Sequence, residues 1–279
     1  MSQPSRGLTK VPDLTMAVVL ARGLGTRMRR EDGAADLTAE QAEAADSGAK
    51  AMMPIGRPFL DHVISALADG GITDVCLVTG PEHTAIRAYY DGLVTERVRI
   101  HHAIQAEALG TANAVQAAEQ VTGSRRFLVV NGDNYYASEV VAALAQATGN
   151  TLAGYDRTAL VELSNIDADR VSAFALVEAS DGLLVDILEK PAPAIVEAAG
   201  PHAMISMNCF TFTPRVYDAC RAISPSARGE YEIVDAVRWL VAHDEPVTVV
   251  PVQSGVLDLS RRSDVVGVEQ VLRGRTVIV

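Results

Sequence analysis

The chain has 279 residues, with 24 Lys+Arg against 35 Asp+Glu and a formal net charge of −11. So acidic a chain lacks the broad basic face that nucleic acids and anionic membranes require, so we expect neither as a partner. Apolar residues make up 48% of the sequence, which excludes a disordered protein. The basic residues are 21 arginines and only three lysines, Lys10, Lys50 and Lys190.

The cysteines and the chain start indicate the compartment. Cys76, Cys209 and Cys220 are widely spaced, which argues against a disulfide scaffold and against a thiolate zinc site. The first residues contain no apolar signal-peptide core, and no stretch reaches the roughly 20 apolar residues of a membrane helix. We therefore expect a cytoplasmic protein.

The first half of the chain alternates between apolar runs and amphipathic stretches. The apolar runs predict strands over Met16–Leu20, Val75–Thr79, Val98–Ala103 and Phe127–Asn131. Helical spacing predicts helices over Leu60–Asp69, Pro81–Tyr90 and Ala112–Val121. This alternation predicts an α/β protein with a Rossmann-like, mostly parallel sheet flanked by helices. Ligands of such sheets bind beyond the carboxyl ends of the strands.

The second half has a more mixed pattern. A hairpin is predicted from Ala173–Val177 and Leu184–Leu188, joined through Ser180-Asp181-Gly182. Further strands are predicted over Ser206–Phe212 and Val247–Val252, and helices over Glu232–His243 and Arg262–Leu272. Because no repeat and no Gly/Ser linker interrupts the sequence, we expect a single domain over residues 1–279.

An acidic segment, Glu31–Asp46, holds six carboxylates and no basic residue. Without it the net charge would be −11 + 6 = −5. The composition favours an inserted, solvated loop with a short helix at Thr38–Ala45. A lid over the binding site is the alternative.

The turn after the first strand carries the strongest motif, LARGLGTRM over Leu20–Met28. Gly23 and Gly25 let backbone N–H groups approach a polyphosphate, and Arg27 offers a planar fork of donors to phosphate oxygens. Met28 occupies the place of the third glycine of a dinucleotide-binding motif, which disfavours a dehydrogenase. The Walker A pattern is absent as well.

This turn resembles the L-A-x-G-x-G-T-R-[ML] motif of sugar-1-phosphate nucleotidyltransferases, and further segments match the same family in order. They are Ala49–Leu60 (AKAMMPIGRPFL), Gln105–Ala112 (QAEALGTA), Gly132-Asp133, Leu188–Pro191 (LEKP), Asn208 and Gly229–Asp235 (GEYEIVD). The matches run from about Met16 to Leu272. Two of the three lysines, Lys50 and Lys190, fall where the family places lysine, in a chain that otherwise prefers arginine.

The resemblance implies transfer of a nucleotidyl group from an NTP to a sugar 1-phosphate, with Mg²⁺ as cofactor and release of pyrophosphate. It implies catalytic roles for Arg27 and Lys50, and Mg²⁺ ligation by Asp133 and Asp258. The nucleotide would be bound by Leu20, Ala21, Gly23, Leu24, Gly25, Thr26, Gln105, Gly110, Thr111 and Asp133. Glu189, Lys190 and Asn208 would bind the sugar phosphate. A nucleotide-binding half would cover about 16–135 and a smaller sugar-side β region about 150–260, with an acidic loop inserted at 31–49.

Three positions depart from the family pattern: Arg22 replaces a small residue, and Ser172 and Ser260 each replace a glycine. The two altered sugar-side positions, Ser172 and Ser260, leave open another acceptor, such as a cyclitol phosphate, phosphocholine or a phosphonate. A catalytically silent nucleotide-sugar-binding homologue also stays open. So does a glycosyltransferase that binds its metal through a D-x-D such as Asp167-Ala168-Asp169. The sequence fixes neither the base, nor the acceptor, nor whether the chain forms a homo-oligomer.

Overall fold

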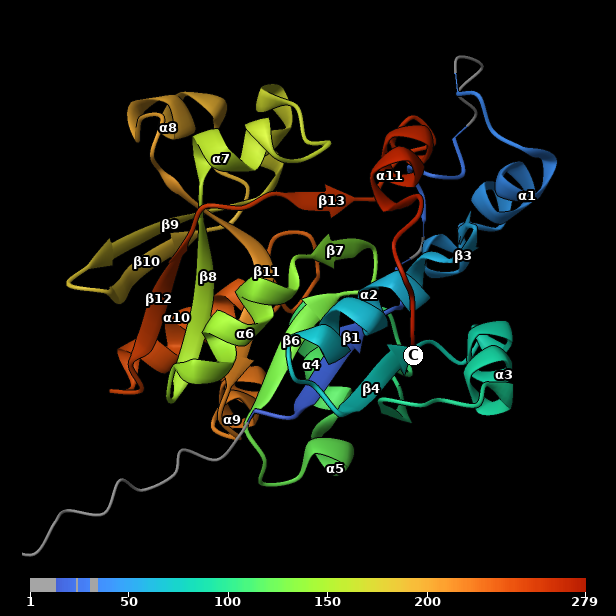
Figure 1. Cartoon of the computed structure of the whole chain (residues 1–279). Coiled ribbons are helices and arrows are strands. Elements are labelled where there is room, and N and C mark those ends of the chain that lie inside the picture. Colours follow the sequence, from blue (N-terminus) through green and yellow to red (C-terminus); the bar gives the residue numbers. More distant parts are fainter. Residues whose placement is uncertain (1–13, 24, 31–34) are drawn as a thin grey trace, which may run out of the picture.

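Among the residues that the structure describes, nine strands form one mixed sheet with helices on both faces (Figure 1). The structure is a computed structural model that describes residues 14–23, 25–30 and 35–279. Leu24 of the expected nucleotide site, and Glu31 and Asp32 of the acidic segment, lie outside these ranges.

The nine strands are arranged in the order β5-β4-β1-β6-β11-β8-β12-β10-β9. Their bounds are β1 (Met16–Leu20), β4 (Asp74–Thr79), β5 (Arg99–Ile104), β6 (Phe127–Asn131), β8 (Asn150–Asp156), β9 (Ala175–Ser180), β10 (Leu183–Leu188), β11 (Met204–Phe212) and β12 (Val247–Val252). Two small sheets pair β7 (Asn134–Tyr136) with β13 (Val256–Asp258), and β2 (Pro54–Ile55) with β3 (Arg57–Pro58).

The helices connect these strands. They are α1 (Ala39–Ser47), α2 (Phe59–Asp69), α3 (Thr84–Gly92), α4 (Thr111–Ala117), α5 (Glu119–Thr122), α6 (Ser138–Gln146), α7 (Arg157–Glu162), α8 (Pro193–Ala198), α9 (Val216–Ala222), α10 (Ile233–Ala242) and α11 (Asp264–Leu272). Two short 3₁₀ helices cover Lys50–Met52 and Ala168–Ala173.

The half of the sheet formed by β5, β4, β1 and β6 is parallel. β1 pairs in parallel with β4 and with β6, and β4 pairs in parallel with β5. After β1 the chain first forms β4 and β5 on one side of that strand and only later forms β6 on its other side. The strand order therefore reverses at β1. A crevice forms outside the carboxyl ends of strands at such a switch point. The expected Rossmann-like fold is confirmed, with the predicted strands in place to within a residue or two.

The other half of the sheet curls on itself. β11 runs antiparallel to β6 and β8, and the start of β11 also pairs with β9. The pairings β8–β12, β12–β10 and β10–β9 complete a closed ring of five strands. Only β10 and β11 oppose the remaining strands in direction, but five of the nine pairings between the described strands of this sheet are antiparallel, so the sheet is mixed. This ring is the smaller β region that the resemblance implied.

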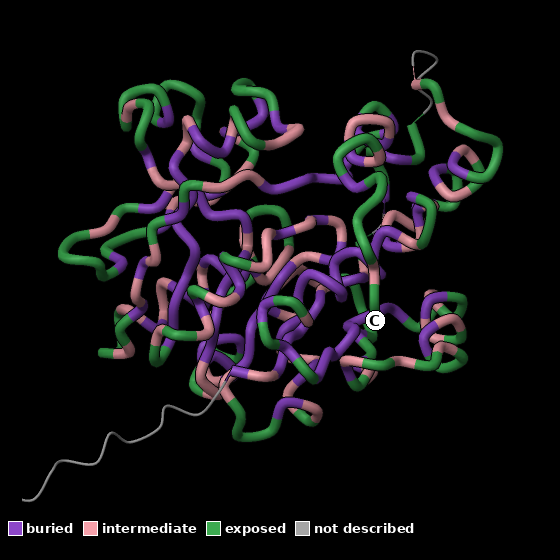
Figure 2. The backbone as a smooth tube through the Cα atoms, in the orientation of Figure 1, coloured by how far each residue is buried: buried purple, intermediate pink, exposed green. Residues whose placement is uncertain are grey.

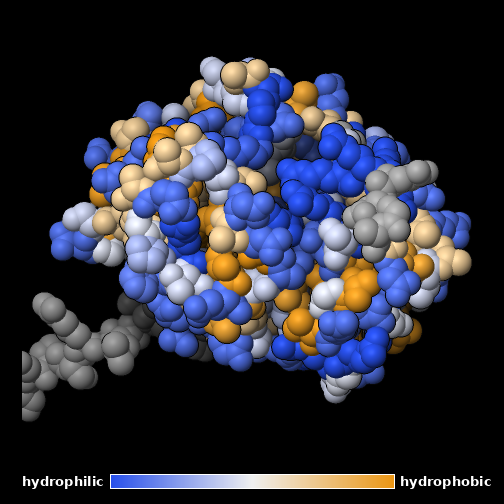
Figure 3. Space-filling view, turned by 90° about the horizontal axis from the view of Figure 1, so that it is seen from above, coloured by the Kyte–Doolittle hydropathy of each residue, from blue (hydrophilic) through white to orange (hydrophobic). Residues whose placement is uncertain are grey.

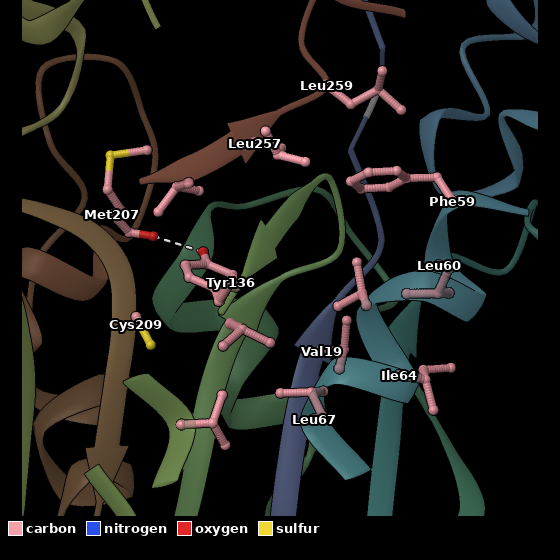
Figure 4. Close-up of a cluster of buried hydrophobic side chains, with 14 of the residues drawn as sticks. Val19, Phe59, Leu60, Ile64, Leu67, Tyr136, Met207, Cys209, Leu257 and Leu259 are labelled. Atoms are coloured by element: carbon pink, nitrogen blue, oxygen red, sulfur yellow. Dashed lines mark hydrogen bonds between the residues drawn. The ribbon is translucent and has the colours of Figure 1, made fainter. Parts of the chain in front are cut away.

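Alternating side chains of the strands fill a core on each face of the sheet. Ala17 and Val19 of β1 pack on the face covered by α2, whereas Met16 and Val18 pack on the opposite face, as the two-residue period of a strand requires. Figure 2 shows the resulting buried centre. In Figure 4, Val19 lies among α2 side chains, and the Tyr136 hydroxyl donates to the Met207 carbonyl at 2.6 Å.

Some segments differ from the sequence-based expectations. The fully buried strand β8 was not predicted, and the expected helix Ala112–Val121 is broken into α4 and α5. By contrast, the short helix expected at Thr38–Ala45 is confirmed as α1, which Thr38 caps through a reciprocal capping box with Gln41. The hairpin is confirmed as well, since Asp181 and Gly182 adopt φ of +51° and +78°, as a two-residue turn requires.

The described helices are all too short or too polar to cross a bilayer. The face seen in Figure 3 is largely hydrophilic, with apolar residues scattered over it.

Candidate active site

A cavity of about 460 Å³ opens at the carboxyl ends of the parallel strands and extends to the five-stranded ring. Most of the expected site residues line it: Leu20, Gly23, Gly25, Thr26, Arg27, Lys50, Gln105, Gly110, Thr111, Asp133, Glu189, Lys190, Asn208 and Asp258. Ala21 lines a smaller adjoining cavity instead, together with Lys50 and Asp133. Segments that are far apart in the sequence thus meet at one site, although the role of each residue stays a prediction.

The glycine-rich turn is fixed by a close approach of two backbone segments. Gly25 has φ of +61°, and a Cβ atom on it would lie 2.4 Å from the carbonyl oxygen of Gly48. Only glycine fits there, because the contact is to backbone and the conformation is left-handed. Arg27, two residues later, is exposed at the mouth of the cavity and makes no ion pair within the described part of the chain.

The acidic helix α1 is docked against this turn. Buried Arg262 donates from Nε to the carbonyls of Met28 and Arg30, each at 2.9 Å, and its guanidinium also contacts Asp46 at the end of α1. Arg29 donates to the Ser47 carbonyl at 2.8 Å. The insertion therefore ends against the glycine-rich turn and leads directly into Lys50.

Lys50 and Asp133 meet across the cavity wall. Lys50 Nζ lies 2.7 Å from Asp133 Oδ2, and both side chains are mostly buried. Asp133 follows β6, so it lies next to the turn that follows the neighbouring β1. Lys50 and Arg27 are far apart in the sequence, but α1 and the short helix that begins at Lys50 bring the chain back to the same cavity.

Asp258 lies on the strand opposite this pair. The Leu259 N–H donates to the Asp133 carbonyl at 2.9 Å, so the two aspartates are neighbours. The Asp258 carboxylate accepts from Asn134 at 3.0 Å and Ser260 at 2.9 Å, and it pairs with Arg170. Burial and the Asp133 charge raise the pKa of Asp258 to about 6, although Ser260 and Arg170 oppose the shift.

The carboxylates fit a metal that takes most of its ligands from substrate and water. No described group of three or more His, Cys, Asp and Glu side chains could hold a metal ion. Mg²⁺ is commonly bound by one or two carboxylates together with phosphate oxygens. Asp133 Oδ1 takes no hydrogen bond from the described residues, whereas Asp258 Oδ1 already accepts two and Asp258 Oδ2 accepts one. Asp133 is therefore the better ligand of the two.

Gln105 is held rigidly where β5 ends. Its side-chain amide donates to the Gly110 carbonyl at 3.0 Å and to Asn113 Oδ1 at 2.9 Å. The side-chain oxygen is therefore the group of Gln105 that is left for a ligand. A Cβ atom on Gly110 would lie 2.6 Å from the Tyr231 carbonyl, so this glycine lets residues 109–112 pack against the GEYE segment.

Glu189 and Lys190 end β10 at the far side of the cavity. Their charged atoms are 3.6 Å apart. Burial, followed by the charge of Glu232, raises the pKa of Glu189 to about 7, while Arg228 opposes the shift. Arg228, which sequence analysis missed, lines the cavity and binds Glu232 at 2.6 Å. Its place directly before the GEYE motif was the available signal.

Asn208 lies in a bulge that bends β11. The register with β8 shifts between Ser206 and Phe210, and Asn208 has φ of +55°. Asparagine tolerates this left-handed conformation better than most residues. The bulge turns Asn208 out of the ladder and into the cavity lining.

Several positions considered from the sequence lie elsewhere or act differently. Asp167 and Asp169 are exposed and do not line the cavity, so the structure does not support a D-x-D metal site. Ser172 also lies outside the lining, whereas Ser260 lines it and hydrogen-bonds Asp258.

The fold and the cavity together are typical of the class of α/β nucleotide-binding proteins, with a glycine-rich turn beside a carboxylate. The family model described as nucleotidyl transferase matches residues 16–258. This chain therefore belongs to the nucleotidyl transferase family, and the family expected from its motifs is confirmed.

Named relatives and solved structures agree with this family. The chain is 29% identical over 262 residues to UTP–glucose-1-phosphate uridylyltransferase AglF of Haloferax volcanii, covering 93% of this chain and 97% of that protein. It is 29% identical over 228 residues to a glucose-1-phosphate thymidylyltransferase of Streptomyces griseus, covering 81% of this chain and 57% of that protein. A UTP-bound UGPase of Acinetobacter baumannii shares the fold, with a TM-score of 0.72, 17% identity and 95% coverage of both chains.

Proposed function

We propose that this protein transfers a nucleotidyl group from a pyrimidine NTP to a sugar 1-phosphate in the presence of Mg²⁺. The observation that carries the proposal is the contact between Lys50 and Asp133, 2.7 Å apart in the cavity that Arg27 also lines. A cation, a carboxylate and a glycine-rich turn from three separate segments suit a reaction between two polyanions.

The reaction is an in-line displacement at the α-phosphorus. An oxygen of the sugar phosphate forms a new P–O bond there, the bond to the β-phosphate breaks, and pyrophosphate leaves with that electron pair. Arg27 and the backbone N–H groups of the turn would hold the leaving phosphates. Lys50 would neutralise charge between the α-phosphate and the attacking oxygen. When bound at Asp133, Mg²⁺ would supply further charge neutralisation.

The hydrogen bonds of Gln105 indicate which base the nucleotide carries. Its amide hydrogens are engaged by Gly110 and Asn113, so the remaining oxygen would accept from the base. The N3–H of uracil or thymine is such a donor. The relatives named above as uridylyl- and thymidylyltransferases support the same choice.

The residues at the far side of the cavity indicate a sugar 1-phosphate as the acceptor. Glu189 and Asn208 would bind sugar hydroxyls, and Lys190 would bind the phosphate attached to the sugar. Residues 16–135 would form the nucleotide half and residues 150–260 the sugar half of a single domain. The cytoplasmic location and a homo-oligomer stay predictions from the sequence.

The test is pyrophosphate release by purified protein with Mg²⁺ over a panel of NTPs and acceptors, including cyclitol phosphates, phosphocholine and phosphonates. We expect the highest activity with UTP or dTTP and a hexose 1-phosphate. Lys50→Met and Asp133→Asn should each lower kcat about 100-fold or more, because each removes charge stabilisation at the reacting phosphates.

A matched control is Asp181→Asn at the exposed tip of the β9–β10 hairpin, which should retain wild-type activity. Turnover only with a non-sugar acceptor would replace the sugar in the proposal. Tight nucleotide-sugar binding without turnover, unaffected by Lys50→Met, would instead identify a silent homologue.

A further inference from the structure

Arg22 lies within the glycine-rich turn, where the family motif leads one to expect a small residue. Its side chain is only 10% exposed and lines the cavity. A guanidinium at this place can act in two ways. It can bind the phosphates of a ligand, or it can form all its hydrogen bonds with groups of the protein.

The guanidinium of Arg22 makes its hydrogen bonds within the protein, to Glu82 and Gln105. Its Nε donates to Glu82 Oε1 at 3.1 Å, and its Nη2 lies 3.5 Å from Glu82 Oε2. Its Nη1 donates to the backbone carbonyl of Gln105 at 2.7 Å. A paired arginine has its charge neutralised locally, which leaves Arg27 as the exposed cation of the turn.

Glu82 is built into this arrangement. It follows β4, and a Cβ atom on Gly80 would lie 2.2 Å from Glu82 Oε1, so the glycine makes room for the carboxylate. A hydrogen bond with its own backbone and the charge of Arg22 lower the pKa of Glu82. The carboxylate is therefore ionised throughout the neutral pH range.

All polar groups of Gln105 except one form hydrogen bonds with described residues. Its N–H donates to the Thr79 carbonyl at 2.9 Å, its carbonyl accepts from Arg22, and its side-chain amide donates to Gly110 and Asn113. The side-chain oxygen alone is left without a partner among the described residues. Arg22 is the one member of this set that comes from the phosphate-binding turn.

We propose that Arg22 is a positioning residue that links the phosphate-binding turn to Gln105 and so determines how selectively the base is bound. The proposal rests on the proposed function, because it takes Gln105 as the residue that reads the base. The guanidinium joins the ends of β1, β4 and β5 at one point. A ligand bound at the turn would therefore find Gln105 already in place.

The experiment compares Arg22→Ala, Arg22→Lys and Glu82→Gln with the wild type by steady-state kinetics and by equilibrium binding of UTP without acceptor. Arg22→Ala should raise KM and Kd for UTP about tenfold, the effect of losing roughly one hydrogen bond. Its preference for UTP over CTP, ATP and GTP should shrink by a similar factor. Its kcat and its KM for the sugar phosphate should stay within about twofold of the wild-type values.

The two conservative variants should change base preference by intermediate amounts. Arg22→Lys keeps the charge but has no planar fork, so it should lie between alanine and wild type. Glu82→Gln should change base preference in the same direction and by less. Arg157→Ala is the matched control, because Arg157 is also mostly buried, with 14% exposure, pairs with Glu197 and donates to backbone carbonyls outside the cavity.

Two results would overturn the inference. One is a loss in kcat or in sugar-phosphate binding with unchanged base preference, which would make Arg22 a phosphate ligand. The other is the same change in Arg157→Ala, which would make the effect merely structural. Because UTP binding is measured without turnover, an inactive wild type that binds UTP selectively refutes the proposed reaction while still testing Arg22. A wild type that binds no NTP refutes both.

Discussion

Glu189 lies among like charges at the sugar side of the cavity. Glu232, Asp235 and Glu230 raise its pKa in addition to burial, and Arg228 offsets only part of this effect. The carboxyl group is therefore partly protonated near neutral pH, although an ionised carboxylate is the stronger acceptor for sugar hydroxyls. Such a perturbed group in a cleft is typical of a binding or catalytic site.

This pKa makes a prediction about stability. The folded-state pKa of about 7 lies above the ordinary value of 4.5, so between these pH values the folded state binds more protons than the unfolded state. The free energy of unfolding should then fall as pH rises through this window, by an amount on the order of 1 kcal/mol. Glu189→Gln should flatten the decline in denaturant titrations at a series of pH values.

Glu178→Gln on the exposed part of β9 is the matched control and should retain the wild-type pH profile. An equal decline in wild type and Glu189→Gln would show that Glu189 is not the group responsible.

At the scale of elements, α1 depends on contacts outside itself. It is a short helix with Thr38 and Gln41 at one end and Asp46 at the other, and isolated helices of this length are marginal in water. Arg262, just before α11, contacts Asp46 and the carbonyls of Met28 and Arg30. One buried guanidinium thus joins the insertion to the phosphate-binding turn.

We expect Arg262→Ala to lower the free energy of unfolding by about 2–3 kcal/mol, because it leaves buried carbonyl groups unpaired. It should also raise KM for the NTP, since the turn loses its support. Chemical denaturation and steady-state kinetics measure the two effects. Arg261→Ala, at an exposed neighbouring position, should change neither; if it matched Arg262→Ala, the docking of α1 would not be the cause.

The parallel strands and their helices could be predicted from sequence because a buried strand such as Met16–Leu20 is a continuous apolar run. β8 could not, because its central Gly154 interrupts the apolar pattern. That glycine is required by packing: a Cβ atom on it would lie 2.9 Å from a Val249 methyl group. Only the neighbouring strand reveals this constraint.

The cavity lining was largely predictable because most of its residues belong to motifs that resemble those of the nucleotidyltransferase family. What the sequence could not supply were the partners. The link from Lys50 to Asp133 and the links from Arg22 to Glu82 and Gln105 join positions far apart in the chain. Arg170, which contacts both Asp258 and Asp264, was likewise invisible before the fold brought them together.

For the whole molecule, the net charge of −11 does not describe the site. Five basic residues, Arg22, Arg27, Lys50, Lys190 and Arg228, line the cavity against five acidic ones, Asp133, Glu189, Glu230, Glu232 and Asp258. The cavity is thus close to balanced, and the excess acidic charge lies elsewhere, including on α1. In the proposed reaction, two anionic substrates would therefore depend on local cations and on a metal ion for neutralisation.

The most direct test of the proposed reaction follows the α-phosphate. Protein is incubated with Mg²⁺, UTP carrying radioactive phosphorus in its α-phosphate, and glucose 1-phosphate, or with the best pair from the panel. We expect the label to appear in a nucleotide-sugar, with one unlabelled pyrophosphate released for each molecule formed. Label that appears only in free UMP, or that stays in UTP with every acceptor, would contradict the account.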